Sequence, residues 1–231
     1  MGLPEKGWLE KDSLLVRMLK ALLSACLLLA LLSPALPLKC RFNFNKAGLT
    51  YNGYAKTTCE SFQDSCEASV LHTNINKREV QIENTCLSSR YCFSGDYSFT
   101  AADGKFFEMK MQCCNTDLCN NETLSLPDRN MLAENGLQCP SCFSKGEKKC
   151  KSEKTINCLE NETQCVDFKG ALFQGFIQHR RFTFQGCATT NFCAIQKNGR
   201  GFIATKRILL LVYKESCYNA SRISHQPEQE G

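Results

Sequence analysis

The chain has 231 residues, enough for one or two domains, and 17 of them are cysteine. So many cysteines argue against an ordinary cytosolic enzyme, in which thiols stay reduced and scattered. The charged fraction of 22% and the hydrophobic fraction of 43% exclude a disordered chain and a protein with many membrane spans. The formal net charge of +5 forms no obvious basic stripe, so nucleic acid is not an expected partner.

Residues 1–37 are predicted to be a secretory signal peptide. The apolar run Ala21–Ala35 is fifteen residues long, which is too short to span a bilayer but typical of a signal-peptide core. Arg17 supplies positive charge ahead of the run, and Met18 is an alternative start that gives a more ordinary signal length. The other interpretation is an uncleaved anchor, which is disfavoured because Pro34 closes the run quickly.

Residues 38–120 are predicted to be a first domain made of β-hairpins. Apolar and polar residues alternate between the cysteines, and no stretch has a convincing helical period. Two hairpins are predicted: Ala68–His72 with Glu79–Glu83, and Tyr97–Thr100 with Lys105–Gln112 around the turn signal Asp103-Gly104.

Residues 121–136 are polar and turn-rich and are the predicted linker to a second domain at 137–219. In that domain Gly201–Ile203 and Ile208–Tyr213 resemble strands, with Asn198-Gly199 as a nearby turn. The tail, 220–231, is polar and lacks a lipid-anchor signal. We therefore expect a soluble, secreted, extracellular product without a membrane anchor.

The cysteines repeat with one spacing in both predicted domains. From Cys40 to Cys113 the spacings are 19, 7, 20, 6 and 21 residues, and from Cys139 to Cys217 they are 19, 7, 22, 6 and 24 once the additional cysteines Cys142 and Cys150 are set aside. This agreement indicates a tandem duplication. Removal of Cys26 with the signal leaves eight cysteines in each half, an even number that favours disulfides in an oxidising compartment. In the chain-entropy model, each bridge that closes about twenty to thirty residues contributes roughly 3 kcal/mol.

The segment Gln112–Asn120 contains two adjacent cysteines, a third cysteine five residues later and a following asparagine. It resembles the closing signature of the three-finger (lymphocyte-antigen-6/urokinase-receptor) family. The resemblance implies a small disulfide-rich all-β protein of two tandem three-finger (snake-toxin-like) domains. Adjacent cysteines in a strand point to opposite faces and so reach different partners. The side-chain amide of Asn120 is then expected to bond backbone groups between fingers.

The resemblance also implies the disulfide pairing, which spacing alone leaves open because eight cysteines allow 105 connectivities. The first half lacks the short bridge of the first finger, and the second half lacks the closing cystine and asparagine. The implied pairs are Cys40–Cys66, Cys59–Cys86, Cys92–Cys113 and Cys114–Cys119 in the first half, and Cys139–Cys165, Cys142–Cys150, Cys158–Cys187 and Cys193–Cys217 in the second.

More narrowly, the segments Asn135–Cys142 and Gly186–Thr190 are similar to the second domain of gamma-type phospholipase A2 inhibitors. That resemblance implies a secreted protein that binds a phospholipase A2 by direct protein–protein contact. The alternative, from another functional class, is an extracellular adhesion or signalling ligand for cell-surface receptors, similar to the urokinase receptor. Three-finger domains bind many different partners on one scaffold, so the fold does not choose between the two.

We expect neither catalysis nor a bound cofactor or metal. The three histidines, His72, His179 and His225, lie near no credible nucleophile or carboxylate pair in the sequence. The spacing of Cys139 and Cys142 suits zinc, but Cys150 and the secretory signal favour oxidation to a disulfide.

Two kinds of surface site are predicted. Phe173, Phe176, Arg180 and Arg181 surround a glycine in the second half and are candidate partner-binding residues, because aromatic and arginine side chains dominate binding hot spots. The alternative is that the phenylalanines, Phe182 included, pair across strands or fill the surface between the domains. Three Asn-x-Ser/Thr triplets are predicted N-glycosylation acceptors: Asn121, Asn161 and Asn219.

Overall fold

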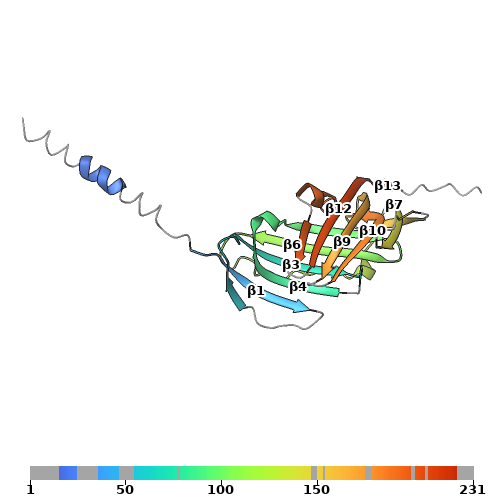
Figure 1. The fold of residues 1–231 in the computed structure, drawn as a ribbon, viewed down its shortest axis with the longest axis horizontal. Helices are drawn as coiled ribbons and strands as arrows, with labels where there is room; N and C mark the ends of the chain where they lie inside the picture. The colour runs from blue at the N-terminus through green and yellow to red at the C-terminus, as the bar shows by residue number, and fades with distance from the viewer. Residues whose placement is uncertain are drawn as a thin grey trace, which may run out of the picture. The chain divides into compact units, whose positions relative to one another are not determined.

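The computed structural model describes residues 16–24, 36–46, 55–76, 79–146, 150–152, 154–174, 178–198, 201–205 and 208–222 (Figure 1). The chain divides into two compact units, Met1–Pro37 and Leu38–Gly231. In the first unit, residues 16–24 form a helix. Within the described ranges, a helix with the length and apolarity to cross a membrane is not found.

In its described residues, the first half of the second unit contains six strands and a short 3-10 helix. They are β1 (Lys39–Lys46), β2 (Ala55–Thr58), β3 (Ser65–Thr73), β4 (Glu79–Leu87), η1 (Ser89–Tyr91), β5 (Gly95–Ala101) and β6 (Lys105–Cys114). Both predicted hairpins are present, as β3 with β4 and β5 with β6. Asp103 and Gly104 have φ of 58° and 62°, the left-handed conformation that the two central residues of a type I′ turn require, and the Lys105 N–H donates to the Ala102 carbonyl across them.

The part of the second half that the structure describes contains seven strands and a 3-10 helix, and a further 3-10 helix lies in the linker. The linker helix is η2 (Arg129–Met131), and the elements after it are β7 (Glu134–Lys145), β8 (Lys154–Leu159), β9 (Gln164–Gln174), β10 (Gln178–Ala188), η3 (Phe192–Asn198), β11 (Gly201–Thr205), β12 (Ile208–Asn219) and β13 (Ser221–Arg222). The predicted strands at 201–203 and 208–213 lie in β11 and β12. Asn198, predicted in a turn, ends η3, and Gly199 lies outside the described residues.

One continuous sheet joins the two halves (Figure 1). Its strand order is β11-β12-β9-β10-β5-β6-β3-β4-β1-β2, so the junction lies between β10 and β5. Gly186 pairs with Ala101 there. A Cβ atom on Gly186 would lie 2.0 Å from the carbonyl oxygen of Thr100, so this close approach of two backbones requires glycine.

A single aromatic core lies under that junction. Its largest fully buried members include two phenylalanines from the first half and four from the second: Phe99, Phe107, Phe168, Phe182, Phe184 and Phe192. The ring centroids of Phe99 and Phe184 are 3.9 Å apart in a stacked arrangement. Phe182 is therefore a core residue between the halves, as the alternative interpretation of the phenylalanines expects. Each half completes the core of the other.

The linker packs against the opposite face of the first-half sheet. Leu124 is buried against Ala68 and Val70, whereas Leu71, the next residue along β3, faces the aromatic core. Consecutive strand residues point to opposite faces, so the first-half sheet is covered on both sides. The last predicted linker residues, 134–136, already belong to β7.

Eight disulfides join the pairs that the family resemblance implies. In the first half, Asn120 closes the base of the fingers. Its Oδ1 accepts from the Arg41 backbone N–H at 2.9 Å, and its Nδ2 donates to the carbonyls of Arg41 and Glu67 at 3.0 and 2.8 Å. In the second half, β13 pairs with β7 instead, and the Ala220 N–H donates to the Thr163 carbonyl at 3.1 Å.

Candidate functional site

The exposed side of β9, β10 and β12 is the first candidate site. Alternate residues of these strands, such as Phe168, Phe184 and Val212, are buried in the aromatic core. The residues between them point to the other side. We call this side the outer face and define it by five residues: Lys169, Phe173, Arg181, Leu211 and Tyr213.

Aromatic and basic side chains meet on the outer face. Arg181 and Leu211 both lie opposite Ala171, one on each neighbouring strand. The Arg181 guanidinium carbon is 6.0 Å from the centroid of the Tyr213 ring, whose residue is 47% exposed. Lys214 follows Tyr213 at an irregularity in the register, and its Nζ lies 3.8 Å from Asp167 Oδ2.

The three predicted partner-binding residues that the structure describes do not lie on one side of the sheet. Phe173 is partly buried and Arg181 is exposed, both on the outer face. Arg180 is also exposed, but as the neighbour of Arg181 in β10 it points to the opposite side. Phe176 lies outside the described residues. Tyr213 was missed because only the pairing of β12 with β9 brings it beside Arg181.

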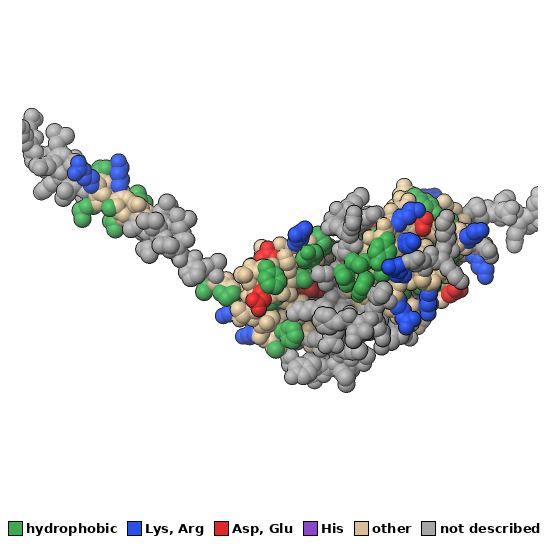
Figure 2. All heavy atoms as spheres, in the orientation of Figure 1, with side chains coloured by type: hydrophobic (Ala, Val, Ile, Leu, Met, Phe, Trp, Pro, Cys, Tyr) green, Lys and Arg blue, Asp and Glu red, His purple; other side chains and the backbone are tan. Residues whose placement is uncertain are grey.

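Positive charge is concentrated in the second half. Residues 137–219 contain 13 lysines and arginines against 6 aspartates and glutamates, whereas residues 38–120 contain 9 of each. Figure 2 shows Lys and Arg side chains gathered over the part of the molecule formed by β7, β9, β10 and β12. The outer face therefore lies in a positive field, which attracts acidic partners.

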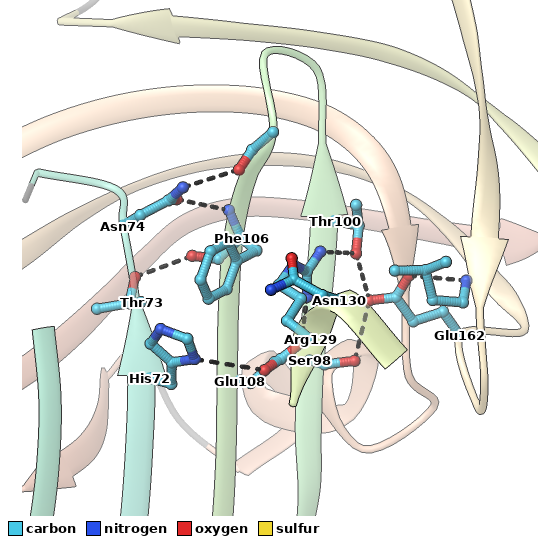
Figure 3. A network of polar contacts seen from close by, with 12 residues as sticks. His72, Thr73, Asn74, Ser98, Thr100, Phe106, Glu108, Arg129, Asn130 and Glu162 are labelled. Carbon is cyan, nitrogen blue, oxygen red and sulfur yellow. Dashed lines mark hydrogen bonds and ion pairs between the residues drawn. The ribbon is translucent and has the colours of Figure 1, made fainter. Parts of the chain in front are cut away.

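A cavity of 350 Å³ between the halves is the second candidate site. It is bordered by β5, β6, the linker and the turn between β8 and β9. Figure 3 shows Arg129, from η2, between Glu108 and Thr100. Arg129 forms a short ion pair with Glu108 and donates to Thr100 Oγ1 at 2.7 Å. Its guanidinium carbon lies 4.1 Å from the centroid of the Phe106 ring, so the linker is held on the first half.

Glu162 ties the second half to the same network (Figure 3). Its Oε1 accepts from Ser98 Oγ at 3.0 Å and from Thr100 Oγ1 at 2.8 Å, and its Oε2 accepts from the Leu159 N–H at 3.3 Å. Burial raises the pKa of Glu162 to about 7, against the opposing effect of these donors. Burial also raises the pKa of Glu108, although Arg129 opposes the shift.

His72 lies closer to carboxylates than the sequence analysis expected. Antiparallel pairing of β3 with β6 places His72 opposite Glu108, and its Nδ1 is 3.9 Å from Glu108 Oε2. The ring packs edge-on against Phe106, with centroids 4.7 Å apart. This nearly buried pair is typical of a structural contact rather than of a base that faces a substrate. The side chain of His179 and all of His225 lie outside the described residues.

The clustered cysteines do not offer metal ligands in this oxidation state. Among the residues that the structure describes, three groups bring possible ligand atoms within 4.8 Å of one another: Cys40, Cys59 and Cys86; Cys139, Cys158 and Cys187; and Cys193, Glu215 and Cys217. Every cysteine in them is bonded to another sulfur and has no thiolate to donate. Cys139 and Cys142, at the spacing that suits zinc, belong to two different disulfides.

The three predicted glycosylation acceptors are exposed. Asn121 lies in the linker and Asn219 at the end of β12, where Gln164 Nε2 donates to Asn219 Oδ1 at 3.0 Å. Asn161 lies in the turn between β8 and β9 and borders the cavity. Glycosylation of these residues stays a prediction.

Comparisons with known proteins find a matching family model, related sequences and a solved structure. The u-PAR/Ly-6 domain model matches residues 47–122 and 135–226. A gamma-type phospholipase A2 inhibitor of Laticauda semifasciata is 31% identical over 152 residues, which are 64% of this chain and 80% of that protein. The urokinase plasminogen activator surface receptor of Bos taurus is 36% identical over 85 residues, 36% of this chain and 24% of that protein. The crystal structure of mouse TEX101 aligns with 80% of this chain and with 99% of its own chain. The sequence identity is 23% and the TM-score is 0.33.

Proposed function

The chain belongs to the u-PAR/Ly-6 family, and from this premise we propose that it is a secreted, non-enzymatic binding protein that inhibits a secreted phospholipase A2. The similarity to a gamma-type phospholipase A2 inhibitor, which extends over 152 residues, supports this choice of partner. Inhibition acts by direct contact, in which the bound protein obstructs the lipid-facing surface or the mouth of the active site.

The outer face of the second half is the observation that carries the proposal. It combines an exposed Tyr213 with Arg181 and Lys169 in the more basic half of the molecule. Tyrosine and arginine are among the side chains most enriched in binding hot spots, and a positive field speeds association with an acidic partner. We therefore expect the preferred phospholipase to present an acidic surface.

The shared core supports the same role through rigidity. Because Phe99 of one half stacks on Phe184 of the other, we expect the two halves to move together and to lose little freedom on binding. A preorganised surface of this kind holds its contacts in place before the partner arrives. The proposal thus assigns recognition to the outer face and rigidity to the core.

Surface plasmon resonance with the full secreted glycoprotein and a panel of acidic and basic secreted phospholipases A2 tests the proposal. We expect an acidic enzyme to bind, and the variant Arg181→Glu to raise Kd by about tenfold or more, with weaker binding at high salt. Lys56→Glu is the matched control, because Lys56 is an exposed lysine on β2 in the first half. Lack of any complex at micromolar concentration, or equal losses in both variants, contradicts the proposal.

A second candidate function is that of an adhesion or signalling ligand for a cell-surface receptor. The similarity of 85 residues to the urokinase plasminogen activator surface receptor favours it. The same protein, labelled and applied to intact cells, separates the two functions. Saturable binding to cells together with no binding to any phospholipase in the panel would support the second function and exclude the first.

A further inference from the structure

One wall of the interhalf cavity is apolar and open to solvent. Leu126, Pro127, Met131 and Leu132 of the linker border the cavity, and Met131 is 80% exposed. Exposure of a methionine beside other apolar side chains leaves apolar surface that a bound group would cover. Arg129 in η2 holds this wall in position, because it forms an ion pair with Glu108 and donates a hydrogen bond to Thr100.

The opposite rim is a turn that presents Asn161. The Glu162 N–H donates to the Leu159 carbonyl at 2.9 Å, and Glu160 adopts the left-handed conformation with φ of 46°. The Glu162 side chain, in a residue only 2% exposed, is hydrogen-bonded to Ser98 and Thr100 and anchors the turn. Asn161 is exposed at the rim, and Asn161-Glu162-Thr163 is a complete N-glycosylation triplet.

We propose that the cavity is the docking site of the innermost sugars of an N-linked glycan carried by Asn161. The sugars start at the rim, because the glycosidic bond forms on the Asn161 side-chain nitrogen. This inference rests on passage of the chain through the secretory pathway, which the proposed function also requires, and not on the identity of the partner. Neither Asn121 nor Asn219 borders the cavity, so the arrangement is specific to one of the three acceptors.

The chemistry of the cavity suits a hexosamine. Such a sugar has an apolar C–H face and an acetamido methyl group, which fit against Met131 and Leu132, and hydroxyls that donate hydrogen bonds. Asp96 and Glu160 offer exposed carboxylate acceptors at the border of the cavity. The volume of 350 Å³ is at the small end for ligand sites, which accommodates one or two sugars rather than a whole glycan.

Native deglycosylation of the full secreted chain tests the inference. Protein from glycosylating cells is treated with an amidase that releases N-glycans, and release at Asn161 and Asn121 is followed by mass spectrometry of peptides. Asn121 is the internal reference, since it is exposed and lies in the linker. If the sugars are docked in about nine molecules of ten, release at Asn161 is slowed by about tenfold relative to Asn121. After denaturation and reduction, the two rates become equal.

A pair of surface variants tests the site itself. Met131→Lys removes apolar contact from the cavity wall and is expected to abolish most of the protection at Asn161. Phe62→Lys is the matched control, because Phe62 is 70% exposed and does not border the cavity. Both substitutions are at exposed positions, so both proteins are expected to fold and to be secreted at similar levels.

Three outcomes overturn the inference. Equal native release at the two acceptors, a glycan on Asn121 without one on Asn161, or unchanged protection in Met131→Lys would each do so and leave phospholipase binding untouched. Absence of glycans from both acceptors also overturns the inference, because the secreted chain then carries no sugar at Asn161 for the cavity to bind. Binding to a phospholipase without protection at Asn161 would separate the two proposals.

Discussion

The two halves have the same strand pattern but close their finger bases in different ways. The first half uses the Cys114–Cys119 disulfide and the side chain of Asn120, which bonds to Arg41 and Glu67. The second half lacks both devices and uses the two-residue strand β13 and the Ala220 N–H instead. A buried amide with three partners holds two strands at once, whereas a short edge strand adds a few backbone bonds.

This difference indicates that the second half depends on the first half for its stability. Its open base is offset by four phenylalanines in the aromatic core, and β10 pairs with β5 of the first half. Conversely, residues of the second half bury Phe99 and Phe107 of the first half. Neither half buries its apolar residues alone, so we expect one cooperative folding unit from two repeats.

The largest expected effect on stability comes from a substitution that disrupts the shared core. Phe184→Ala removes a fully buried ring that stacks on Phe99 and is expected to lower the free energy of unfolding by about 3–5 kcal/mol. Hydrogen exchange should then increase in both halves together, as measured by mass spectrometry on peptides from each. Phe62→Ala, at an exposed position, is the control and should change stability by less than about 0.5 kcal/mol. Increased exchange in the second half alone would show two independent domains.

The next effect concerns Glu162, which joins the halves. Its pKa rises from 4.5 to about 7 on folding, so the neutral carboxyl is the form that the fold favours. Stability from this group is complete below pH 4.5 and is lost as pH rises to about 7, by about 3 kcal/mol in total. Burial shifts the pKa of Glu108 in the same direction.

Urea unfolding at pH values from 4.5 to 8 measures this dependence. Glu162→Gln should flatten it, since the amide carries no charge at any pH and its oxygen still accepts from Ser98 and Thr100. Glu60→Gln, at an exposed position outside this network, is the control and should keep the slope of the wild type. An unchanged slope in Glu162→Gln would place the titrating group elsewhere.

The closure of the first half is tested by Asn120→Ala. The substitution leaves the N–H and carbonyl of Arg41 and the carbonyl of Glu67 without their partner, and we expect a loss of about 2 kcal/mol. Thermal and urea unfolding of the disulfide-intact protein measure it. Asn130→Ala, at an asparagine of η2 that is not buried, should have little effect. A loss below about 0.5 kcal/mol would mean that the disulfides alone close this half.

The smallest effect is expected at the base of the second half. Ala220→Pro removes the N–H that donates to the Thr163 carbonyl and should cost about 1 kcal/mol, less than Asn120→Ala. Local hydrogen exchange in β7 near Gln138, which pairs with β13, should rise more than exchange in the first half. A cost equal to or greater than that of Asn120→Ala would reverse the comparison between the two closures.

Sequence alone was sufficient for the features that depend on local pattern. The repeated cysteine spacing predicted two copies of one unit, and turn signals such as Asp103-Gly104 located the hairpins. Asn120 could be singled out because it follows the last cysteine of a recognisable closing segment. These features depend on neighbours in the chain, so spacing and local sequence carry the information, whereas the disulfide pairing was implied by the family resemblance.

Tertiary structure decided everything that depends on the register between distant strands. Ser98 and Glu162 are 64 residues apart, His72 and Glu108 are on different hairpins, and Tyr213 reaches Arg181 only across β9. A strand that slips by one residue turns every side chain to the other face, so these meetings follow from packing of the shared core. The sequence therefore determined the two scaffolds, and the core between them decided how their surfaces combine into an outer face and a cavity.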